Sequence, residues 1–326
     1  MKILVIGCGS IGERHIRNIY SLGNHTIIAV DPNQIKLNKL KNEFPAVVTN
    51  SELKKVWTLT PDVAFICTPT SIHLSTALIA AKHHCHLFIE KPLSHSTTDI
   101  SKLLHLVTKN KLITMVACNW RFYWAIAKIK SLLKKRIIGT ALSTRISAGS
   151  YLPEWHPQED YRTLYAAQSK LGGGAILDFI HEFDYAHWLF GDIDKMTGMY
   201  GKLGNLEIDT EDFAEMLMTT KTGSFISIHV DYLQKVYERS CTIIGTEGTA
   251  IWNFSSSKIK IYLAKTKVWK EISEPKNYDL NQMYQDELEY FFACVVKNKK
   301  SDNDVFHAVK ILKYLLKFKR DAVHVK

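Results

Sequence analysis

The sequence predicts an α/β protein with a doubly wound parallel sheet at its N-terminus and a second α/β domain built on an open, mainly antiparallel sheet. Three observations predict this class. Strand-like apolar runs alternate with helical patterns up to about residue 118, which is typical of parallel strands joined by crossover helices. Beyond residue 138, short β-prone segments are joined by turns such as Lys221-Thr222-Gly223, which favours antiparallel pairing. The 326 residues are 46% hydrophobic, which is enough for two cores.

The elements follow in order along the chain. In the first domain we expect strands at residues 3–6, 26–30, 63–67, 87–89 and 113–117, with helices between them, for example at 71–83 and 98–109. In the second domain the β-prone segments are 138–150, 211–220, 224–233, 240–246 and 249–263, and two helices near 282–296 and 302–319 close the chain. We place the domains at 1–120 and 121–326, with a cleft between them and the last helix packing back on the first domain.

The first strand runs directly into a glycine-rich turn, Gly7-Cys8-Gly9-Ser10-Ile11-Gly12. The first glycine permits a tight turn, the second lets a pyrophosphate approach the backbone, and the third lets the helix pack on the strand. Phosphates would then lie at the positive end of the helix. The glycines alone also fit an ordinary strand-to-helix loop. Asp31, which closes the next apolar run, favours a dinucleotide site, because a carboxylate there accepts from ribose hydroxyls.

The same carboxylate indicates which dinucleotide binds. A 2′-phosphate beside Asp31 would bring two anions together unless a cation lay between them. The following residues, Pro32-Asn33-Gln34, supply no cation. The sequence therefore favours NAD over NADP.

Composition excludes several other classes of protein. No apolar run is long enough for a membrane span, and the N-terminus lacks the pattern of an export signal. Six scattered cysteines without a CxxC pair fit reduced thiols in the cytoplasm. The net charge of +10 could suit a nucleic-acid binder, but the basic residues near the C-terminus alternate with apolar residues at helical spacing. We interpret them as a solvated helix face and predict no nucleic-acid partner.

A run of possible metal ligands, His83-His84-Cys85-His86, precedes the fourth predicted strand. Imidazole and thiolate groups bind zinc, but consecutive residues do not readily converge on one tetrahedral ion. The spacing also differs from that of zinc motifs. We therefore predict no metal.

Four further motifs occur in order after the glycine turn. They are Cys67-Thr68-Pro69-Thr70-Ser71-Ile72-His73, Glu90-Lys91-Pro92, Asn119-Trp120-Arg121-Phe122, and Gly172-Gly173-Gly174 leading to Asp178, His181 and Asp184. In this combination the chain closely resembles the Gfo/Idh/MocA family of nicotinamide-dependent sugar and cyclitol dehydrogenases. The resemblance covers nearly the whole chain. It implies a Rossmann domain followed by an α/β domain whose open sheet carries the substrate on one face and often an oligomer contact on the other.

The resemblance also implies roles for individual residues. The glycine turn, with Ser10 and Ile11, and Asp31 would hold the cofactor, and the nicotinamide side would be lined by Thr68, Pro69, His73 and Glu90. Lys91 would reach both the cofactor and the reacting hydroxyl, where a cation stabilises a developing alkoxide. Pro92 would follow a cis peptide bond. His181 would take the substrate's hydroxyl proton while Asp178 orients it, and an imidazole suits this task because its ordinary pKa is about 6.5.

The segment 174–190 has apolar residues at helical spacing, which predicts one helix with an apolar stripe. The stripe consists of Ala175, Phe179, Phe183, Ala186 and Phe190. The polar residues Asp178, His181, Asp184 and Tyr185 fall on another side, and without the resemblance this pattern also fits a helix with a satisfied polar face. The chain departs from the family pattern twice. Only two residues separate Asp178 from His181 where relatives have three, and His84-Cys85 replaces a glycine at a helix end, for which we expect a different cap geometry.

Substrate recognition is expected in the loop before the glycine triplet. Trp155 and Tyr161 offer aromatic surface for a sugar ring, and Arg162 could hold a carboxylate or phosphate. An ordinary loop anchored by aromatic residues is the alternative. Arg121 is a further candidate, either as a substrate contact or as a salt bridge that braces the domain boundary.

The sequence therefore predicts a cytoplasmic, homo-oligomeric enzyme, dimer or tetramer, that transfers a hydride between a sugar-type hydroxyl and NAD. A nucleotide sugar or sugar acid of surface-polysaccharide metabolism is among the candidate substrates, because the loop and the His181-Glu182 pair are similar to a branch of the family associated with such sugars. The alternative function is a catalytically silent protein that senses NAD(P). The presence of Lys91, Asp178 and His181 favours the enzyme.

Overall fold

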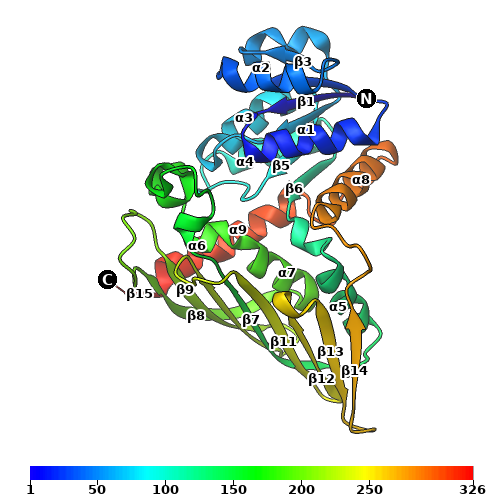
Figure 1. Cartoon of the computed structure of the whole chain (residues 1–326), viewed down its shortest axis with the longest axis vertical. Helices are drawn as coiled ribbons and strands as arrows, with labels where there is room; N and C mark the ends of the chain where they lie inside the picture. The colour runs from blue at the N-terminus through cyan, green and yellow to red at the C-terminus, as the bar shows by residue number, and fades with distance from the viewer. Residues whose placement is uncertain (326) are drawn as a thin grey trace. The chain divides into compact units, whose positions relative to one another are not determined.

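The computed structural model describes residues 1–325 and divides the chain into two compact units. The first unit contains residues 1–118 and 284–312, and the second contains residues 119–283 and the chain from 313 onward. Each unit has its own sheet, one of six strands and one of nine (Figure 1).

The sheet of the first unit is wholly parallel, as predicted, in the order β3-β2-β1-β4-β5-β6. Its strands are β1 (Lys2–Ile6), β2 (Thr26–Val30), β3 (Val48–Asn50), β4 (Val63–Ile66), β5 (His86–Glu90) and β6 (Thr114–Ala117). The helices are α1 (Ser10–Leu22), α2 (Gln34–Glu43), α3 (Thr70–Lys82), α4 (Ile100–Lys109), α8 (Gln282–Val296) and the first part of α9 (Val305–Asp321), with 3₁₀ turns at Leu53–Lys55 and Trp57–Leu59. The strand order reverses between β1 and β4, which is where such sheets bind ligands.

Helices pack on the parallel sheet and bury its strands, which explains their uninterrupted apolar sequences. Phe65 of β4 and Phe88 of β5 stack with their ring centres 4.5 Å apart, and Phe291 of α8 meets Phe88 edge-on. Helix α2 falls in a gap where a helix is expected, but no strand was expected at β3. Helix α2 buries only Leu37 and Leu40, and β3 is a three-residue edge strand, so neither carries a strong apolar pattern.

The end of α3 corrects one expectation. His84 adopts a left-handed conformation with φ of 61°, which is the conformation that a glycine usually supplies at this position. Its N–H bonds the carbonyl of Ala81, and the N–H of Cys85 bonds that of Ala80, which together form a Schellman motif. The predicted change of cap geometry is therefore wrong, because two backbone hydrogen bonds hold the usual geometry without glycine.

The second unit is built on a mixed, mainly antiparallel sheet in the order β14-β13-β12-β11-β7-β10-β9-β8-β15. Only β7 with β10 and β8 with β15 pair in parallel among its described strands. The strands are β7 (Ala141–Gly149), β8 (Ile193–Gly201), β9 (Phe213–Thr220), β10 (Phe225–Asp231), β11 (Glu238–Gly245), β12 (Gly248–Asn253), β13 (Lys258–Leu263), β14 (Val268–Ser273) and β15 (Val323–Val325). None of the expected β segments covers β8, β14 or β15. Of these, β14 and β15 lie at the sheet edges, and β14 is mostly exposed.

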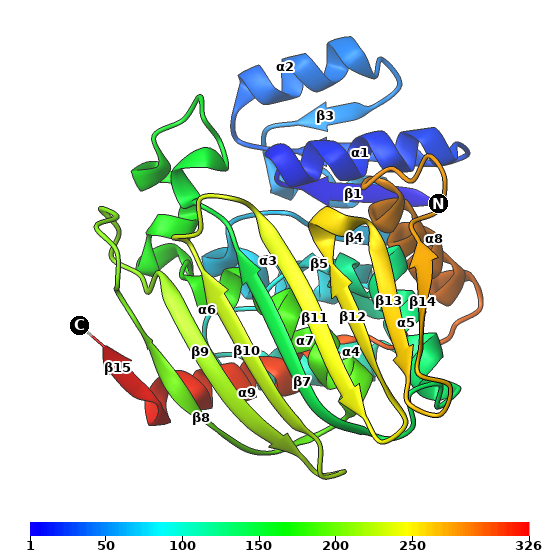
Figure 2. The ribbon, with the colours of Figure 1, turned by 60° about the horizontal axis from the view of Figure 1, so that its bottom comes forward.

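The helices of the second unit are α5 (Trp124–Lys134), α6 (Ala175–Asp178), α7 (Ile180–Phe190) and the end of α9, and 3₁₀ turns lie at Asn119–Arg121, Leu152–Glu154, Tyr161–Thr163, Tyr165–Ala167, Ser169–Leu171 and Phe254–Ser256. Helix α7 lies behind the strands in Figure 2. Ile226, Ile228 and Val230 of β10 are fully buried on the helix side of the sheet, and the residues between them are half-buried. Among the described helices of this unit, none crosses the strand face that Figure 2 turns toward the reader.

No helix within residues 1–325 combines the length and the apolarity that a membrane crossing requires.

His229 lies on this uncovered face between two carboxylates. Its Nδ1 is 2.7 Å from Glu215 and its Nε2 is 3.0 Å from Asp231. Hydrogen bonds with Asp231 and then with Glu215 raise the pKa of His229 to about 9. Because the pKa in the folded protein is raised above the ordinary value of about 6.5, this stabilisation is complete below pH 6.5 and is lost as the pH rises through 9.

We therefore predict that the free energy of unfolding of the native protein falls more steeply between pH 7 and pH 10 than that of His229→Gln. Urea unfolding at each pH measures the difference. His105→Gln, which removes an exposed histidine of α4, is the control. Equal slopes for the native protein and His229→Gln would contradict the assignment.

Candidate active site

The glycine turn after β1 has the geometry of a phosphate-binding loop. Gly7 has a φ of +94°, and a Cβ there would lie 2.5 Å from the carbonyl oxygen of Cys67. A Cβ at Gly12 would lie 1.9 Å from the carbonyl oxygen of Gly7. At Gly9, in contrast, a Cβ would meet nothing within 4 Å. The first and third glycines are therefore required by packing, and the second leaves open space for a ligand to approach the backbone.

Gly9 is also the N-cap of α1, and no side chain caps this helix. Uncapped N–H groups at the start of a 13-residue helix form a favourable site for an anion. The loop thus presents the positive end of α1 beside the open space at Gly9.

Asp31 lies at the end of β2, buried, and holds the glycine turn through the backbone. Its Oδ2 accepts from the N–H of Cys8 at 2.8 Å, and its Oδ1 accepts from the N–H of Asn33 at 2.8 Å. The Nζ of Lys36, in the first turn of α2, lies 4.0 Å from Oδ2. A cation therefore lies near Asp31 just beyond the segment 32–34 that the sequence analysis considered.

The loops after β4 and β5 are tied together by His73. Its Nε2 lies 2.7 Å from the carbonyl oxygen of Thr68, and its Nδ1 lies 2.8 Å from that of Pro92. Burial lowers the pKa of His73. Both ring nitrogens face backbone carbonyls, so His73 ties the two loops together.

Glu90 is held in a similar way by a residue that the sequence analysis missed. Its Oε1 lies 2.6 Å from Nε2 of His15 on α1, and its Oε2 accepts from the backbone N–H of Lys91 at 3.2 Å. His15 is fully buried against the rings of Phe65 and Phe88. The half-buried Lys91 precedes a cis peptide bond to Pro92, as the resemblance implies.

Thr68 supplies an unused polar group at the same edge of the sheet. Its hydroxyl oxygen is buried and has no hydrogen-bond partner within residues 1–325. A buried hydroxyl without a partner is uncommon in folded proteins. Its hydrogen-bonding capacity is therefore unused within residues 1–325.

Two cysteines flank the same loops. Burial raises the pKa of the Cys8 thiol to about 12 and raises the pKa of the Cys67 thiol well above its usual range. Both thiols are therefore protonated near neutral pH and are poor nucleophiles.

In the second unit, the glycine triplet allows the chain to reach α6 through crowded space. A Cβ at Gly173 would lie 2.3 Å from the carbonyl oxygen of Tyr165. Gly174 has a φ of +112°, and a Cβ there would lie 2.4 Å from the carboxylate of Glu211. This carboxylate accepts from the N–H of Ile176 at 3.3 Å and pairs with Lys319 at 3.0 Å. The triplet is thus needed to place the start of α6 against Glu211.

Asp178, at the end of α6, is 5% exposed and bonds two tyrosines. The hydroxyl of Tyr165 donates to its Oδ1, and the hydroxyl of Tyr232 donates to its Oδ2 at 3.0 Å. Burial, and then the charge of Asp178, raise the pKa of Tyr232 well above its usual range. Sequence spacing could not identify either tyrosine, because Tyr232 lies 54 positions away and Tyr165 lies in the irregular loop.

The predicted single helix over 174–190 is wrong in two respects. It breaks at Phe179, which has φ of −87° and ψ of 29° and separates α6 from α7. The predicted polar side is also inside the unit, since every residue from Ile180 to His187 is buried. His181 itself is 8% exposed. Partners from distant elements explain why polar groups can occupy both faces.

Two buried arginines hold the carboxylates of α7. Arg121 donates from Nε and from a terminal nitrogen to Asp184, at 2.6 and 2.7 Å. A terminal nitrogen of Arg239 lies 3.0 Å from Glu182. Asp184, which shares a predicted face with His181, is thus engaged by Arg121, which the sequence analysis considered as a substrate contact or a brace. This bidentate pair lies wholly within the second unit, so it holds Asp184 there and is not a brace across the domain boundary.

The loop residues considered for substrate binding fall into two groups. Trp155 donates to the hydroxyl of Ser150 and meets the ring of Tyr232 edge-on, with ring centres 5.3 Å apart. Because Tyr232 also bonds Asp178, its ring links Trp155 to Asp178. Arg162, in contrast, is about half exposed and pairs with both Asp160 and Glu207.

Tyr161 belongs with Arg162, since its hydroxyl accepts from the backbone N–H of Glu207 at 3.1 Å. These two residues therefore brace the loop against the segment that contains Glu207.

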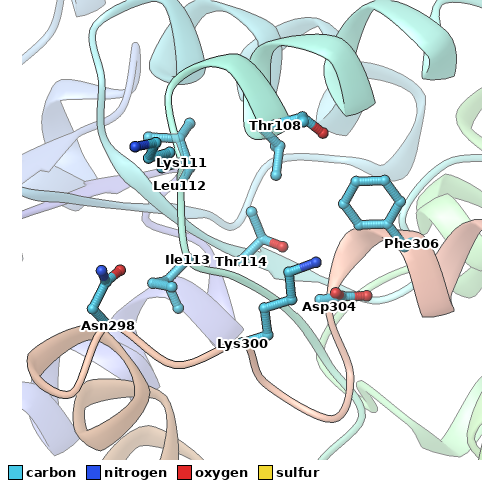
Figure 3. A pocket seen from close by; sticks show the side chains of 10 residues that line it. Thr108, Lys111, Leu112, Ile113, Thr114, Asn298, Lys300, Asp304 and Phe306 are labelled. Carbon is cyan, nitrogen blue, oxygen red and sulfur yellow. The ribbon is translucent and has the colours of Figure 1, made fainter.

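A pocket of about 230 Å³ lies in the first unit away from the glycine turn (Figure 3). It is lined by residues at the start of β6, the end of α4 and the start of α9, among them Thr114, Lys111, Lys300, Asp304 and Phe306. Ligands of parallel sheets bind at the carboxyl ends of the strands, whereas Thr114 is the first residue of β6. The pocket is therefore separate from the candidate cofactor site.

Within residues 1–325, no group of three His, Cys, Asp or Glu side chains is placed to hold a metal ion. In the run considered above, His83 stacks on Trp57, Cys85 is buried, and Nδ1 of His86 accepts from the N–H of Ile113.

Both units match models of known protein families. Residues 1–118 match the family model described as oxidoreductase family, NAD-binding Rossmann fold, and residues 126–251 match the GFO/IDH/MocA C-terminal domain. The chain is 29% identical over 259 residues to an uncharacterized oxidoreductase, YrbE, of Bacillus subtilis, which covers 76% of this chain and 72% of the relative.

Two further matches extend the comparison. The chain is 26% identical over 257 residues to inositol 2-dehydrogenase/D-chiro-inositol 3-dehydrogenase of Shouchella clausii, covering 76% of this chain and 70% of that protein. The fold is similar to that of a levoglucosan dehydrogenase solved in complex with NADH and levoglucosan, with a TM-score of 0.89, 17% identity, and coverage of 98% of this chain and 96% of that one.

We predict that Gly174→Ala lowers the free energy of unfolding by about 2–4 kcal/mol, because a left-handed alanine is strained and its Cβ displaces the Glu211 carboxylate. Gly223→Ala is the matched control, since Gly223 has a φ of +91° but an added Cβ would meet nothing within 4 Å. It should cost only about 1–2 kcal/mol. Equal losses in urea unfolding would show that the Glu211 contact contributes nothing.

Proposed function

Because the chain belongs to the GFO/IDH/MocA family of NAD-binding oxidoreductases, we propose that it is an NAD-dependent dehydrogenase that oxidises a hydroxyl group of a sugar or cyclitol. The observation that carries the proposal is the glycine turn, where open space at Gly9 adjoins the uncapped N-terminus of α1. The names of the similar enzymes support the substrate class.

The residues at the carboxyl end of the parallel sheet fit NAD. The N-terminus of α1 would hold the pyrophosphate, Asp31 the ribose hydroxyls, and the buried hydroxyl of Thr68 would gain a partner. NAD, when bound, supplies the hydride acceptor for the oxidation. We retain NAD over NADP because Asp31 is acidic, while Lys36 at 4.0 Å weakens the rejection of a 2′-phosphate.

His181 is the proposed base that takes the proton of the substrate hydroxyl. An imidazole accepts a proton readily near neutral pH. Asp178, three residues earlier and held by two tyrosine hydroxyls, is the proposed orienting group. Lys91 is proposed to stabilise the developing alkoxide with its ammonium group, and the His15–Glu90 pair supports its backbone.

The aromatic side chains near Asp178 support a ring-shaped, hydroxyl-bearing substrate. Trp155 and Tyr165, which are not buried, combine apolar faces with polar groups, a composition suited to sugar recognition. Tyr232 is fully buried and supports Asp178 from inside the unit. Arg162 is a weaker candidate for holding a substrate carboxylate or phosphate, because it already pairs with Asp160 and Glu207. A sugar acid or nucleotide sugar would therefore need another anion-binding group.

We propose a homo-oligomer, dimer or tetramer, that associates through the uncovered face of the nine-stranded sheet, where Met199, Phe225 and Ile244 are exposed.

We retain a cytoplasmic location on the basis of the cysteines, all six of which are unpaired.

We predict that His181→Ala lowers kcat by about 10²–10⁴-fold, the usual contribution of a general base, while NADH binding measured by fluorescence stays within twofold. The assay is absorbance at 340 nm with cyclitols, sugars, sugar acids and nucleotide sugars. Trp57→Phe, which changes a residue of a 3₁₀ turn in the other unit, is the control. Unchanged turnover would remove His181 from the mechanism. Tight NADH binding without turnover of any substrate would instead favour the silent NAD(P)-sensing protein.

Cofactor preference provides a second prediction. Asp31→Asn removes the negative charge, so the ratio of NADP to NAD affinity should rise about tenfold, or about 1.4 kcal/mol. Both affinities should also fall, because asparagine can accept only one of the two backbone N–H bonds from Cys8 and Asn33, so the ratio and not either affinity alone is compared. Lys36→Met should lower the same ratio, because it removes the nearby cation. Equilibrium binding of both cofactors measures the ratio. If neither variant changed it, these residues would not select the cofactor.

A further inference from the structure

We propose that Arg239 is a positioning residue that fixes the break between α6 and α7 and thereby places His181 relative to Asp178. The inference rests on the proposed role of His181 as the base. Arg239 itself lies in β11 and is 6% exposed, so it acts through other residues.

The guanidinium of Arg239 contacts three segments of the second unit at once. A terminal nitrogen lies 3.0 Å from Glu182, in the first turn of α7. The guanidinium carbon lies 3.9 Å from the ring centre of Trp120 and 5.7 Å from that of Phe179. Arg239 thus touches both the residue at the break and the helix that follows it.

The break matters because of the short spacing between the two polar residues. Only Phe179 and Ile180 separate Asp178 from His181, and in an unbroken helix residues three apart would share one face. At Phe179 the helical pattern changes, since the N–H of Glu182 bonds the carbonyl of Phe179 at 3.2 Å, three residues earlier. The angle between the directions of the Asp178 and His181 side chains, measured around the helix axis, therefore depends on the backbone conformation of Phe179.

Arg239 constrains this backbone through two contacts, one at the break and one after it. It packs against the ring of Phe179 and pairs with Glu182, so a rotation at the break would disturb one contact or the other. A planar guanidinium can pack flat on aromatic rings while it binds a carboxylate, which a lysine ammonium cannot do. The Phe179 ring also meets the rings of Trp155 and Tyr232.

Stability alone does not explain why this pair is charged. Glu182 is fully buried and the Arg239 side chain is 7% exposed, so both ions have lost most of their hydration. A buried ion pair is often no more stabilising than an apolar pair of similar volume, whereas removal of one partner is strongly destabilising. An apolar replacement therefore separates a positioning role from a merely structural one.

The test compares the full-length native protein with Arg239→Met, Glu182→Leu and the double variant. Each protein is measured by urea unfolding, NADH binding, kcat and KM with the best substrate found, and NMR titration of the histidine Cε1–H signals. His181→Ala assigns the His181 signal. Ile259→Ala, in the buried part of β13, controls for lost stability without a change at the break. Arg239→Lys, which retains the charge, replaces Arg239→Met if that variant does not fold.

The single variants should lose stability, and the double variant should recover most of it. If Arg239 positions His181, the double variant should still show a kcat about tenfold below that of the native protein, since small misplacements of catalytic groups slow reactions strongly. Its NADH affinity should be unchanged, and its His181 signal and titration midpoint should be displaced. Arg239→Lys should likewise show a displaced His181 signal and a reduced kcat.

Two results would overturn the inference: a double variant whose kcat lies within twofold of the native value, or a His181 signal and titration that match those of the native protein. Failure of the proposed function is recognised separately, because the native protein would then bind NADH without oxidising any substrate. In that event the displacement of the His181 signal alone decides the role of Arg239.

Discussion

The arrangement around His181 depends on one constraint: a carboxylate that is buried must be met by a donor. Three carboxylates, Asp178, Glu182 and Asp184, are each at most 5% exposed within seven residues of chain. An unpaired charge in such a place would cost several kcal/mol. Their partners come from the loop before α6, the residue after β10, β11 and the turn at residues 119–121. Pairing therefore ties α6 and α7 to the sheet and to the loops, and it orients the segment that carries His181.

In the first unit, by contrast, several polar groups at the carboxyl end of the sheet have no hydrogen-bond partner among the described side chains. Its ligand end has the uncapped start of α1, the open space beside Gly9 and the buried hydroxyl of Thr68. Around these groups, the ring of His73 holds the loops through the backbone carbonyls of two residues, and the pair of Glu90 with His15 adds a second support. Rigid support around unsatisfied donors is what a preformed site for an anionic cofactor requires.

Much of the fold could be predicted from the sequence, because it depends on short-range patterns. The parallel strands are continuous apolar runs. In the glycine turn, only glycine fits at Gly7 and Gly12, because a Cβ at either position would clash with the backbone. The elements that were missed have weak patterns, as the edge strands β3 and β14 show. The break at Phe179 was missed for another reason: the local sequence is helical in pattern, and contacts with Arg239, Trp155 and Tyr232 accompany the change of direction.

By itself, the sequence determined the two kinds of sheet and the glycine turn with Asp31, since apolar period and glycine spacing are short-range patterns. Its ordered motifs pointed to His181 as the candidate base only through the family resemblance. Only the tertiary structure decided which donor meets which buried carboxylate. Asp178 bonds Tyr232 from 54 positions away, Asp184 bonds Arg121 from 63 positions away, and Glu182 pairs with Arg239. The physical reason is that helix spacing reports only neighbours three or four residues apart, whereas a buried charge is satisfied by whatever donor the folded sheet brings beside it.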